Sequence, residues 1–244
     1  MDHENTSVSR PDLVSLSDED GVKKILFSTV LELWDVVNNL TRLQPSRRER
    51  YHVTIFGSAR TEPDAPIYNE VKRLASKLAE MGCDIITGGG PGLMQAANEG
   101  ARSVGAGERN RSVGIRIDLP FEEGANPFVQ HVFSHKTFFT RLHHFIIASD
   151  AFVVVPGGIG TTLETMMVWQ LLQVRHLYRT PLVMVGQMWR DLVEWATQYM
   201  IEGNTELANK KDMDIPRCVD NVDEAVTILK EHHDQWLKQE SSAL

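Results

Sequence analysis

The stretch that decides the fold is Pro156-Gly157-Gly158-Ile159-Gly160-Thr161-Thr162-Leu163-Glu164, which follows the apolar run Ala151-Phe152-Val153-Val154-Val155. An unbroken Val/Phe run that stops at a turn is typical of a central parallel strand with both faces buried. The glycines allow a sharp turn, and Thr161 or Thr162 is suited to cap the following helix. Free N–H groups and the helix dipole would converge at this turn. We therefore expect an α/β fold with an anion site here.

Glu164 distinguishes this turn from a generic phosphate loop. We expect it in the first turn of the helix, beside the anion, where its carboxylate would repel phosphate. Its charge would then serve another part of the ligand. The simpler alternative is a carboxylate that only caps the helix or interacts with its dipole.

Strands and helices alternate through the rest of the chain, which predicts a Rossmann-like doubly wound parallel sheet with right-handed crossovers. The expected strands are 51–56, 84–87, 112–117, 129–133, 151–155 and 181–185. The expected helices between and after them begin near Pro66, Leu93, Lys136, Thr161, Met188 and Asn221, and the last ends near Trp236. A polar loop is expected at 202–214. Ligands bind such sheets beyond the carboxyl ends of the strands, at the topological switch point.

An additional N-terminal helix is expected at about 20–43. One apolar stripe supports it, formed by Val22, Leu26, Val30, Leu33, Val37 and Leu40. Residues 1–18 are expected to be a disordered lead, and 19–244 a single Rossmann-like nucleotide-binding domain with its core at 51–201 and its C-terminal helix at 221–236.

The composition of the 244 residues argues against several classes of function. A net charge of −8 argues against a nucleic-acid-binding surface, which needs a basic stripe. No apolar run could span a bilayer, and the polar N-terminus is unlike a secretory signal, so we expect a cytoplasmic protein without a membrane partner. Cys83 and Cys218 have no metal or redox spacing and are expected to be two buried thiols.

Two further glycine-rich turns are expected at the same edge of the sheet as the first. Gly57-Ser58 follows the first strand, and Gly88-Gly89-Gly90-Pro91-Gly92-Leu93-Met94 follows the second. Tight strand-to-helix turns would also explain these glycines, but their shared edge favours a phosphate site. The expected substrate- or phosphate-binding residues are Gly57, Ser58, Gly89, Gly90, Gly92, Met94, Gly157, Gly158, Gly160 and Thr161.

Arg141 is the remaining candidate, in the segment Phe138-Phe139-Thr140-Arg141-Leu142. An arginine in an apolar helix needs a buried partner or a ligand. The alternative is a surface arginine whose stem covers its apolar neighbours. His135, His143 and His144 lie close by in the sequence, but no carboxylate has ligand spacing to them, so no metal site is expected.

These motifs resemble those of the LOG ("lonely guy") family, whose members are often labelled lysine-decarboxylase-like. Residues 156–164 fill every fixed position of its PGGxGTxxE signature, and 88–94 match its GGGxxGLM loop with one spacer missing. Arg141 falls on the arginine of its FFxRK segment, although Leu142 replaces the lysine. The resemblance implies a Rossmann-like fold and hydrolysis of the N-glycosidic bond of nucleoside 5′-monophosphates. Arg141 and Glu164 would then be catalytic, without a cofactor.

The resemblance also implies a homodimer or a higher even oligomer, because the family's signature helix packs at a dimer contact. Two other functions remain open: a carrier related to the molybdenum-cofactor-binding Rossmann proteins, and a nucleotide sensor without turnover. Ser134-His135-Lys136 is superficially similar to a lysine that binds pyridoxal phosphate. The other parts of such an enzyme are missing from the sequence. Retaining both Arg141 and Glu164 favours hydrolysis, because a phosphate carrier does not need the carboxylate.

Overall fold

The computed structural model describes residues 14–40, 49–104, 111–118, 124–203 and 205–242. The chain divides into two compact units, Met1–Arg47 and Arg48–Leu244. Each unit is described by itself.

The first unit contains the expected additional helix, α1 (Glu19–Leu40). The Asp18 carboxylate accepts a hydrogen bond from the Gly21 N–H at 3.0 Å, which caps the helix start. Of the described side chains in the apolar stripe, Val22 is half-buried, whereas Leu26, Val30 and Leu33 have exposed fractions of 60%, 62% and 60%. Residues 41–43 of the predicted helix and 1–13 of the expected lead lie outside the described residues.

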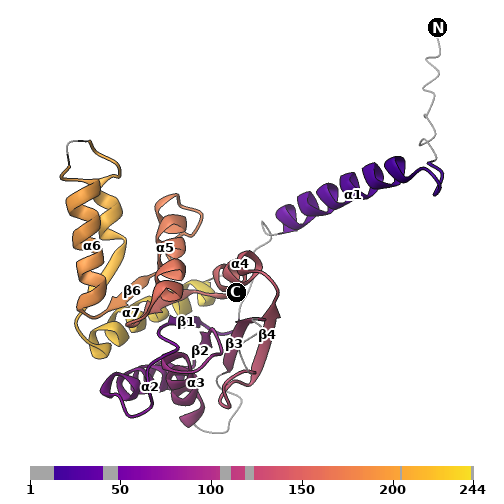
Figure 1. Cartoon of the computed structure of the whole chain (residues 1–244). Helices are drawn as coiled ribbons and strands as arrows, with labels where there is room; N and C mark the ends of the chain where they lie inside the picture. The colour runs from indigo at the N-terminus through magenta and orange to yellow at the C-terminus, as the bar shows by residue number, and fades with distance from the viewer. Residues whose placement is uncertain (1–13, 41–48, 105–110, 119–123, 204, 243–244) are drawn as a thin grey trace. The chain divides into compact units, whose positions relative to one another are not determined.

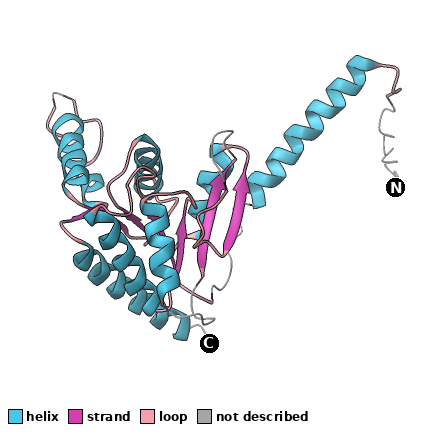
Figure 2. Ribbon diagram, turned by 60° about the horizontal axis from the view of Figure 1, so that its bottom comes forward, coloured by secondary structure: helices cyan, strands magenta, loops and turns pink. Residues whose placement is uncertain are grey.

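The second unit is built on a parallel sheet that confirms the predicted α/β class. The described residues form seven strands in the order β4-β3-β2-β1-β5-β6-β7, and every pairing is parallel. Figure 2 shows strands of the sheet side by side in magenta. The strands are β1 (His52–Phe56), β2 (Asp84–Thr87), β3 (Ser112–Ile117), β4 (His131–His135), β5 (Ala151–Val154), β6 (Leu182–Val185) and β7 (Pro216–Val219).

Helices cover both faces of the sheet. One face packs against α2 (Pro66–Glu80), α3 (Leu93–Ser103) and α7 (Val222–Ser242), and the other against α4 (Phe138–Ala148), α5 (Ile159–Gln173) and α6 (Gln187–Met200). In Figure 1, α2 and α3 lie below the sheet and α4 and α5 above it.

Alternate residues of each central strand enter the two different cores. On β1, Val53 and Ile55 join the core with α2, α3 and α7, whereas Phe56 joins the core with α4, α5 and α6. On β5, Val153 and Val154 divide in the same way. A central strand therefore needs apolar residues at consecutive positions, which explains its unbroken hydrophobic run.

The structure corrects several expected boundaries. Strand β4 and helix α4 each begin two residues later than predicted. Helix α4 begins at Phe138 because Thr137 caps it by accepting a hydrogen bond from the Thr140 N–H. The expected polar loop ends in a short 3-10 helix, η1 (Lys210–Asp214). Strand β7 follows it and was not predicted. It is a short edge strand that begins with Pro216, a position where proline does not interrupt the ladder.

The C-terminal helix α7 begins as expected and runs further. The Asn221 side chain caps the helix by accepting hydrogen bonds from the N–H groups of Asp223 and Glu224. The helix continues to Ser242 rather than ending near Trp236. None of the helices in the described parts of the chain is long and apolar enough to cross a membrane.

Candidate active site

The candidate site lies where the order of successive strands in the sheet reverses. Strand β1 pairs with β2 on one side and β5 on the other, so the chain leaves β1 and β5 at the topological switch point. Backbone hydrogen bonds connect the three glycine-rich turns there. The Ser58 N–H donates to the Pro156 carbonyl at 3.1 Å, and the Ser58 carbonyl accepts from the Leu93 N–H at 2.8 Å. The turn after β1 is therefore hydrogen-bonded to both of the other turns.

The turn after β5 leaves the N-terminus of α5 open. No heavy atom lies within 4 Å of a Cβ built on Gly158 or Gly160, and both residues are exposed. Gly157 is packed closely, since a Cβ there would lie 2.2 Å from Thr161 Oγ1. The first N–H groups of a helix have no acceptor within the helix. The open end of α5 is thus suited to an anion.

Thr161 and Thr162 do not cap α5, contrary to the prediction. The helix begins at Ile159, and its N-cap residue is Gly158, which is in an extended conformation and provides no side chain. Both threonines consequently lie inside the first turn, where Thr162 Oγ1 donates to the Gly158 carbonyl at 3.0 Å. The helix begins two residues earlier than predicted because the chain changes from extended to helical conformation directly after Gly158.

The turn after β2 is packed rather than open. A Cβ on Gly92 would lie 2.4 Å from the Ser58 carbonyl oxygen, and the Leu93 N–H is already bonded to that oxygen. The backbone of the turn after β1 thus covers the N-terminus of α3. The Gly89 N–H donates to Thr87 Oγ1 at 2.9 Å. These glycines therefore permit close approach of backbone, and their contact with a phosphate remains a prediction.

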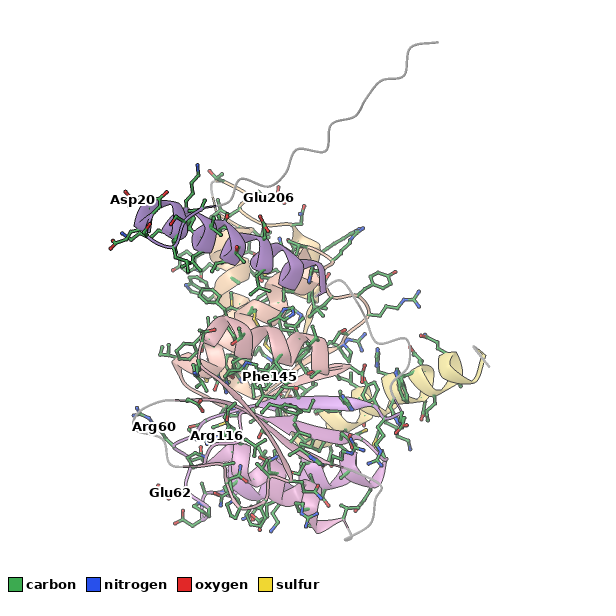
Figure 3. The ribbon with its side chains drawn as sticks, turned by 90° about the vertical axis from the view of Figure 1, so that its right-hand side faces the viewer. Asp20, Arg60, Glu62, Arg116, Phe145 and Glu206 are labelled. Carbon is green, nitrogen blue, oxygen red and sulfur yellow. The ribbon has the colours of Figure 1, made fainter. Side chains whose placement is uncertain are left out.

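Arg141 and Glu164, which the sequence presents far apart, form an ion pair. Arg141 Nη1 lies 3.0 Å from Glu164 Oε1, and the two side chains are only 13% and 10% exposed. Arg141 Nε donates to the Ile115 carbonyl at 3.0 Å, and its guanidinium lies 5.1 Å from the centre of the Phe145 ring. Phe145, labelled in Figure 3, lies between α4 and the sheet. Arg141 is therefore held from three sides by buried groups.

Glu164 was predicted to lie in the first turn of α5. It is instead the sixth residue of the helix. The helix begins at Ile159, so the carboxylate lies too far from the first N–H groups to cap them. Its contacts identify it instead as the partner of Arg141.

Burial dominates the electrostatics of this carboxyl group. Removal from water raises the pKa of Glu164 to about 7, and the Arg141 charge and hydrogen bond offset part of the rise. A carboxyl group with a pKa near neutrality can exchange a proton at physiological pH. Such perturbed groups are frequent in active sites.

Gly88 is a further site residue, whose role could not be predicted from the glycine run alone. A Cβ there would lie 2.5 Å from Arg141 Nη2, so only glycine leaves room for this arginine. The glycine run was visible in the sequence, but the neighbour that requires it comes from α4. Arg116 also reaches this turn, with its Cγ 2.9 Å from a Cβ built on Gly89. Figure 3 labels Arg116 and Arg60 at the left-hand edge of the core.

The histidines near Arg141 form a pair. His135 Nε2 lies 2.9 Å from His144 Nδ1, and burial lowers the pKa of both rings. No group of three or more potential metal ligands occurs among the residues that the structure describes. Lys136 is exposed. Cys83 is buried as expected, whereas Cys218 is only half-buried.

The family model described as "Possible lysine decarboxylase", which includes the LOG proteins, matches residues 94–229. The chain belongs to this family. The match to the LOG family contains both members of the buried ion pair. No curated protein sequence matches the chain closely enough to count as a relative.

Solved structures share the fold of this LOG-family chain at low sequence identity. The X-ray structure of TM1055 is 22% identical with a TM-score of 0.56, covering 74% of this chain and 99% of its own. The molybdenum cofactor carrier protein from Chlamydomonas reinhardtii is 18% identical with a TM-score of 0.56, covering 75% and 98%. The molybdenum cofactor binding protein from Rippkaea orientalis is 15% identical with a TM-score of 0.56, covering 76% and 98%. These likenesses show the fold alone.

Proposed function

We propose that the protein hydrolyses the N-glycosidic bond of a nucleoside 5′-monophosphate, with AMP or an N6-modified AMP favoured, to free base and ribose 5-phosphate. The observation that carries the proposal is the buried ion pair between Arg141 of α4 and Glu164 of α5, 3.0 Å apart, because α5 is the helix whose N-terminus is open to an anion. A phosphate carrier needs the helix end but has no use for the buried carboxylate.

In this proposal, the N-terminal end of α5 binds the phosphate and Glu164, further along the helix, acts on the glycosidic bond. The 5′-phosphate binds at the turn 157–161, which places the ribose toward Glu164. Cleavage passes through an oxocarbenium-like state, as in glycoside hydrolysis generally. The ionised Glu164 stabilises this positive charge and accepts a proton from the attacking water. The C–N electron pair leaves with the base, which takes up a proton, and the water oxygen adds to the anomeric carbon.

Arg141 has two roles in this proposal. Its positive charge keeps Glu164 ionised against the effect of burial, and its guanidinium provides donors for the nucleotide. Leu142, where the family has a lysine, provides no second charge at this point. The site therefore relies on a single arginine from α4.

The direct test is a substrate panel. The purified protein is incubated with AMP, GMP, CMP, UMP and N6-prenylated AMP, and the free base is measured by chromatography. We expect release from at least one monophosphate and almost none from the matching nucleoside, because the nucleoside cannot occupy the phosphate site. If every monophosphate stays intact during long incubation, the proposed reaction is wrong.

A carrier or sensor is the second candidate, favoured by the likeness to molybdenum cofactor carrier proteins. It predicts tight binding of a phosphorylated ligand with no release of base. Calorimetric titration of the same monophosphates, and of molybdenum cofactor, separates this outcome from hydrolysis. Binding without turnover would replace the hydrolase proposal.

We further propose a homodimer or a higher even oligomer. Helix α5 and its C-cap residue expose large apolar side chains, with exposed fractions of 88% at Ile159, 47% at Leu163 and 58% at the C-cap Val174. Closed two-fold assembly is the usual way to cover such surfaces. Light scattering at micromolar concentration should give an even multiple of 27.5 kDa.

A charge on this face of α5 should weaken the assembly. We expect Leu163→Glu to lower the mass toward that of the monomer. Gln235→Glu, which adds the same charge at an exposed position of α7 on the other face of the sheet, serves as the control. A wild-type mass of 27.5 kDa would contradict the proposed oligomer.

A further inference from the structure

We propose that Asn98 and Asn126 are positioning residues: together with Thr87 they form a buried polar network that holds the turn Gly88–Gly90 against the Arg141 guanidinium. The inference concerns the geometry of the Arg141–Glu164 pair. It rests on the proposed function only for its effect on turnover.

The network is buried and its amide groups are bonded. Asn98 Oδ1 accepts from Thr87 Oγ1 at 2.7 Å and from Asn126 Nδ2 at 2.9 Å, and Asn98 Nδ2 donates to Ser112 Oγ at 2.9 Å. Thr87 and Asn98 are fully buried, and Asn126 is nearly so. Burying amides is costly compared with burying apolar groups, so a role in packing alone would not require these residue types.

Three peptide groups of the glycine turn bond to this network. The Gly89 N–H donates to Thr87 Oγ1 at 2.9 Å, and the Gly89 carbonyl accepts from the Asn126 N–H at 2.9 Å. The Gly90 carbonyl accepts from Asn126 Nδ2 at 2.9 Å. A run of three glycines has great conformational freedom, and these bonds select one conformation of it.

That conformation determines the space available to Arg141. The Gly88 Cα lies so close to the guanidinium that a Cβ would be 2.5 Å from Arg141 Nη2, while Nη1 of the same group contacts Glu164. Arg141 is also held at Nε by the Ile115 carbonyl, so it has little freedom to move away. A shift of the turn would therefore change the contact between Arg141 and Glu164.

The test uses Thr87→Val, which keeps the shape of the side chain and removes the hydroxyl that joins Gly89 to Asn98. The pKa of the Glu164 carboxyl is measured by 13C NMR titration without substrate, with Glu164→Gln used to assign the signal. We expect the pKa to rise by about half a pH unit or more, because the nearby Arg141 charge opposes the effect of burial. Turnover should fall about ten- to a hundredfold with little change in KM.

Two variants separate positioning from general stability. Thr87→Ser keeps the hydroxyl and should restore both the pKa and the turnover. Tyr51 directly precedes β1, at the opposite edge of the sheet from the site. Tyr51→Phe removes its hydrogen bond of 2.5 Å to His232 and should lower the stability without changing the Glu164 pKa or the turnover. Asn126→Ala gives the same comparison if Thr87→Val does not fold.

The outcomes also distinguish this inference from the proposed function. A folded Thr87→Val protein with the wild-type Glu164 pKa would overturn the positioning role whether or not the protein is an enzyme. If the pKa moves as expected but even the wild type releases no base, the positioning role stands and the hydrolase proposal fails. If neither Thr87→Val nor Asn126→Ala folds, the network is structural and the inference is wrong.

Discussion

Replacing Glu164 with glutamine is expected to lower kcat by about a hundredfold or more, as for other preorganised electrostatic groups. The substitution keeps the size of the side chain but removes the charge that stabilises the oxocarbenium-like state. Nucleotide affinity should hold or improve, because a negative charge near the phosphate site is gone. Single-turnover and binding measurements are needed separately to divide the loss between the two steps.

The pH profile provides the control for this variant. With a Glu164 pKa of about 7, the fraction of ionised carboxylate falls as the pH drops through neutrality. The wild-type kcat/KM should accordingly decrease below about pH 7, and this limb should be absent from the residual activity of Glu164→Gln. An unimpaired Glu164→Gln enzyme would show that the carboxylate is structural and that the chemistry is assigned to the wrong residue.

Arg141→Ala is expected to weaken nucleotide binding and also to reduce turnover. The variant removes donors for the nucleotide, and it leaves Glu164 buried without its cation. Breaking a buried ion pair on one side typically costs about 3–5 kcal/mol of the free energy of unfolding. Protonation of Glu164 limits this cost, so the loss should depend on pH.

The direction of that dependence follows from linkage. Without Arg141, the folded-state pKa of Glu164 lies further above its unfolded value, so the folded state binds the proton more tightly. Stability should therefore be best preserved at acidic pH and lost as the pH rises through the folded-state pKa. Melting temperatures at pH 6 and pH 8 measure this difference against the wild type.

The double variant Arg141→Ala/Glu164→Gln is the matched control, because it contains no buried unpaired charge. It should melt at nearly the same temperature at both pH values and above the single variant at pH 8. Equal destabilisation of Arg141→Ala at both pH values would contradict the pairing. Unchanged nucleotide affinity in Arg141→Ala would remove the arginine from the binding site.

Local patterns were sufficient to predict the central strands. Strands β2 and β3 begin and end at the predicted residues, and β1 and β5 each differ at one end by one residue. Consecutive apolar residues are required where both faces of a strand are buried, so the signal is contained in the strand itself. Strand β7 carries no such signal, because an edge strand of four residues that begins with proline is set by its pairing with β6.

Some features of the candidate site could likewise be predicted from the sequence, and others could not. The glycine turns, Arg141 and Glu164 could be named from residue type, spacing and family resemblance. Their roles as contacts of phosphate or ribose are still predictions. The pairing of Arg141 with Glu164 was not predicted, since it joins two separate helices, α4 and α5, that lie on the same face of the sheet. The positions of Thr161, Thr162 and Glu164 within α5 were wrong because the helix begins two residues earlier than expected, at Ile159.

The sequence by itself determined the order of the helices and of the strands β1 to β6, the parallel sheet and the edge at which the glycine turns collect. These features depend on local hydrophobic patterning and turn chemistry, which each segment carries independently. Only the tertiary structure decided that the end of α5 is open while the end of α3 is covered by Ser58, and that the Asn98 network lies beneath Gly88–Gly90. Those facts depend on backbone and polar groups of different strands approaching within hydrogen-bond distance, and such distances are not encoded in any single segment.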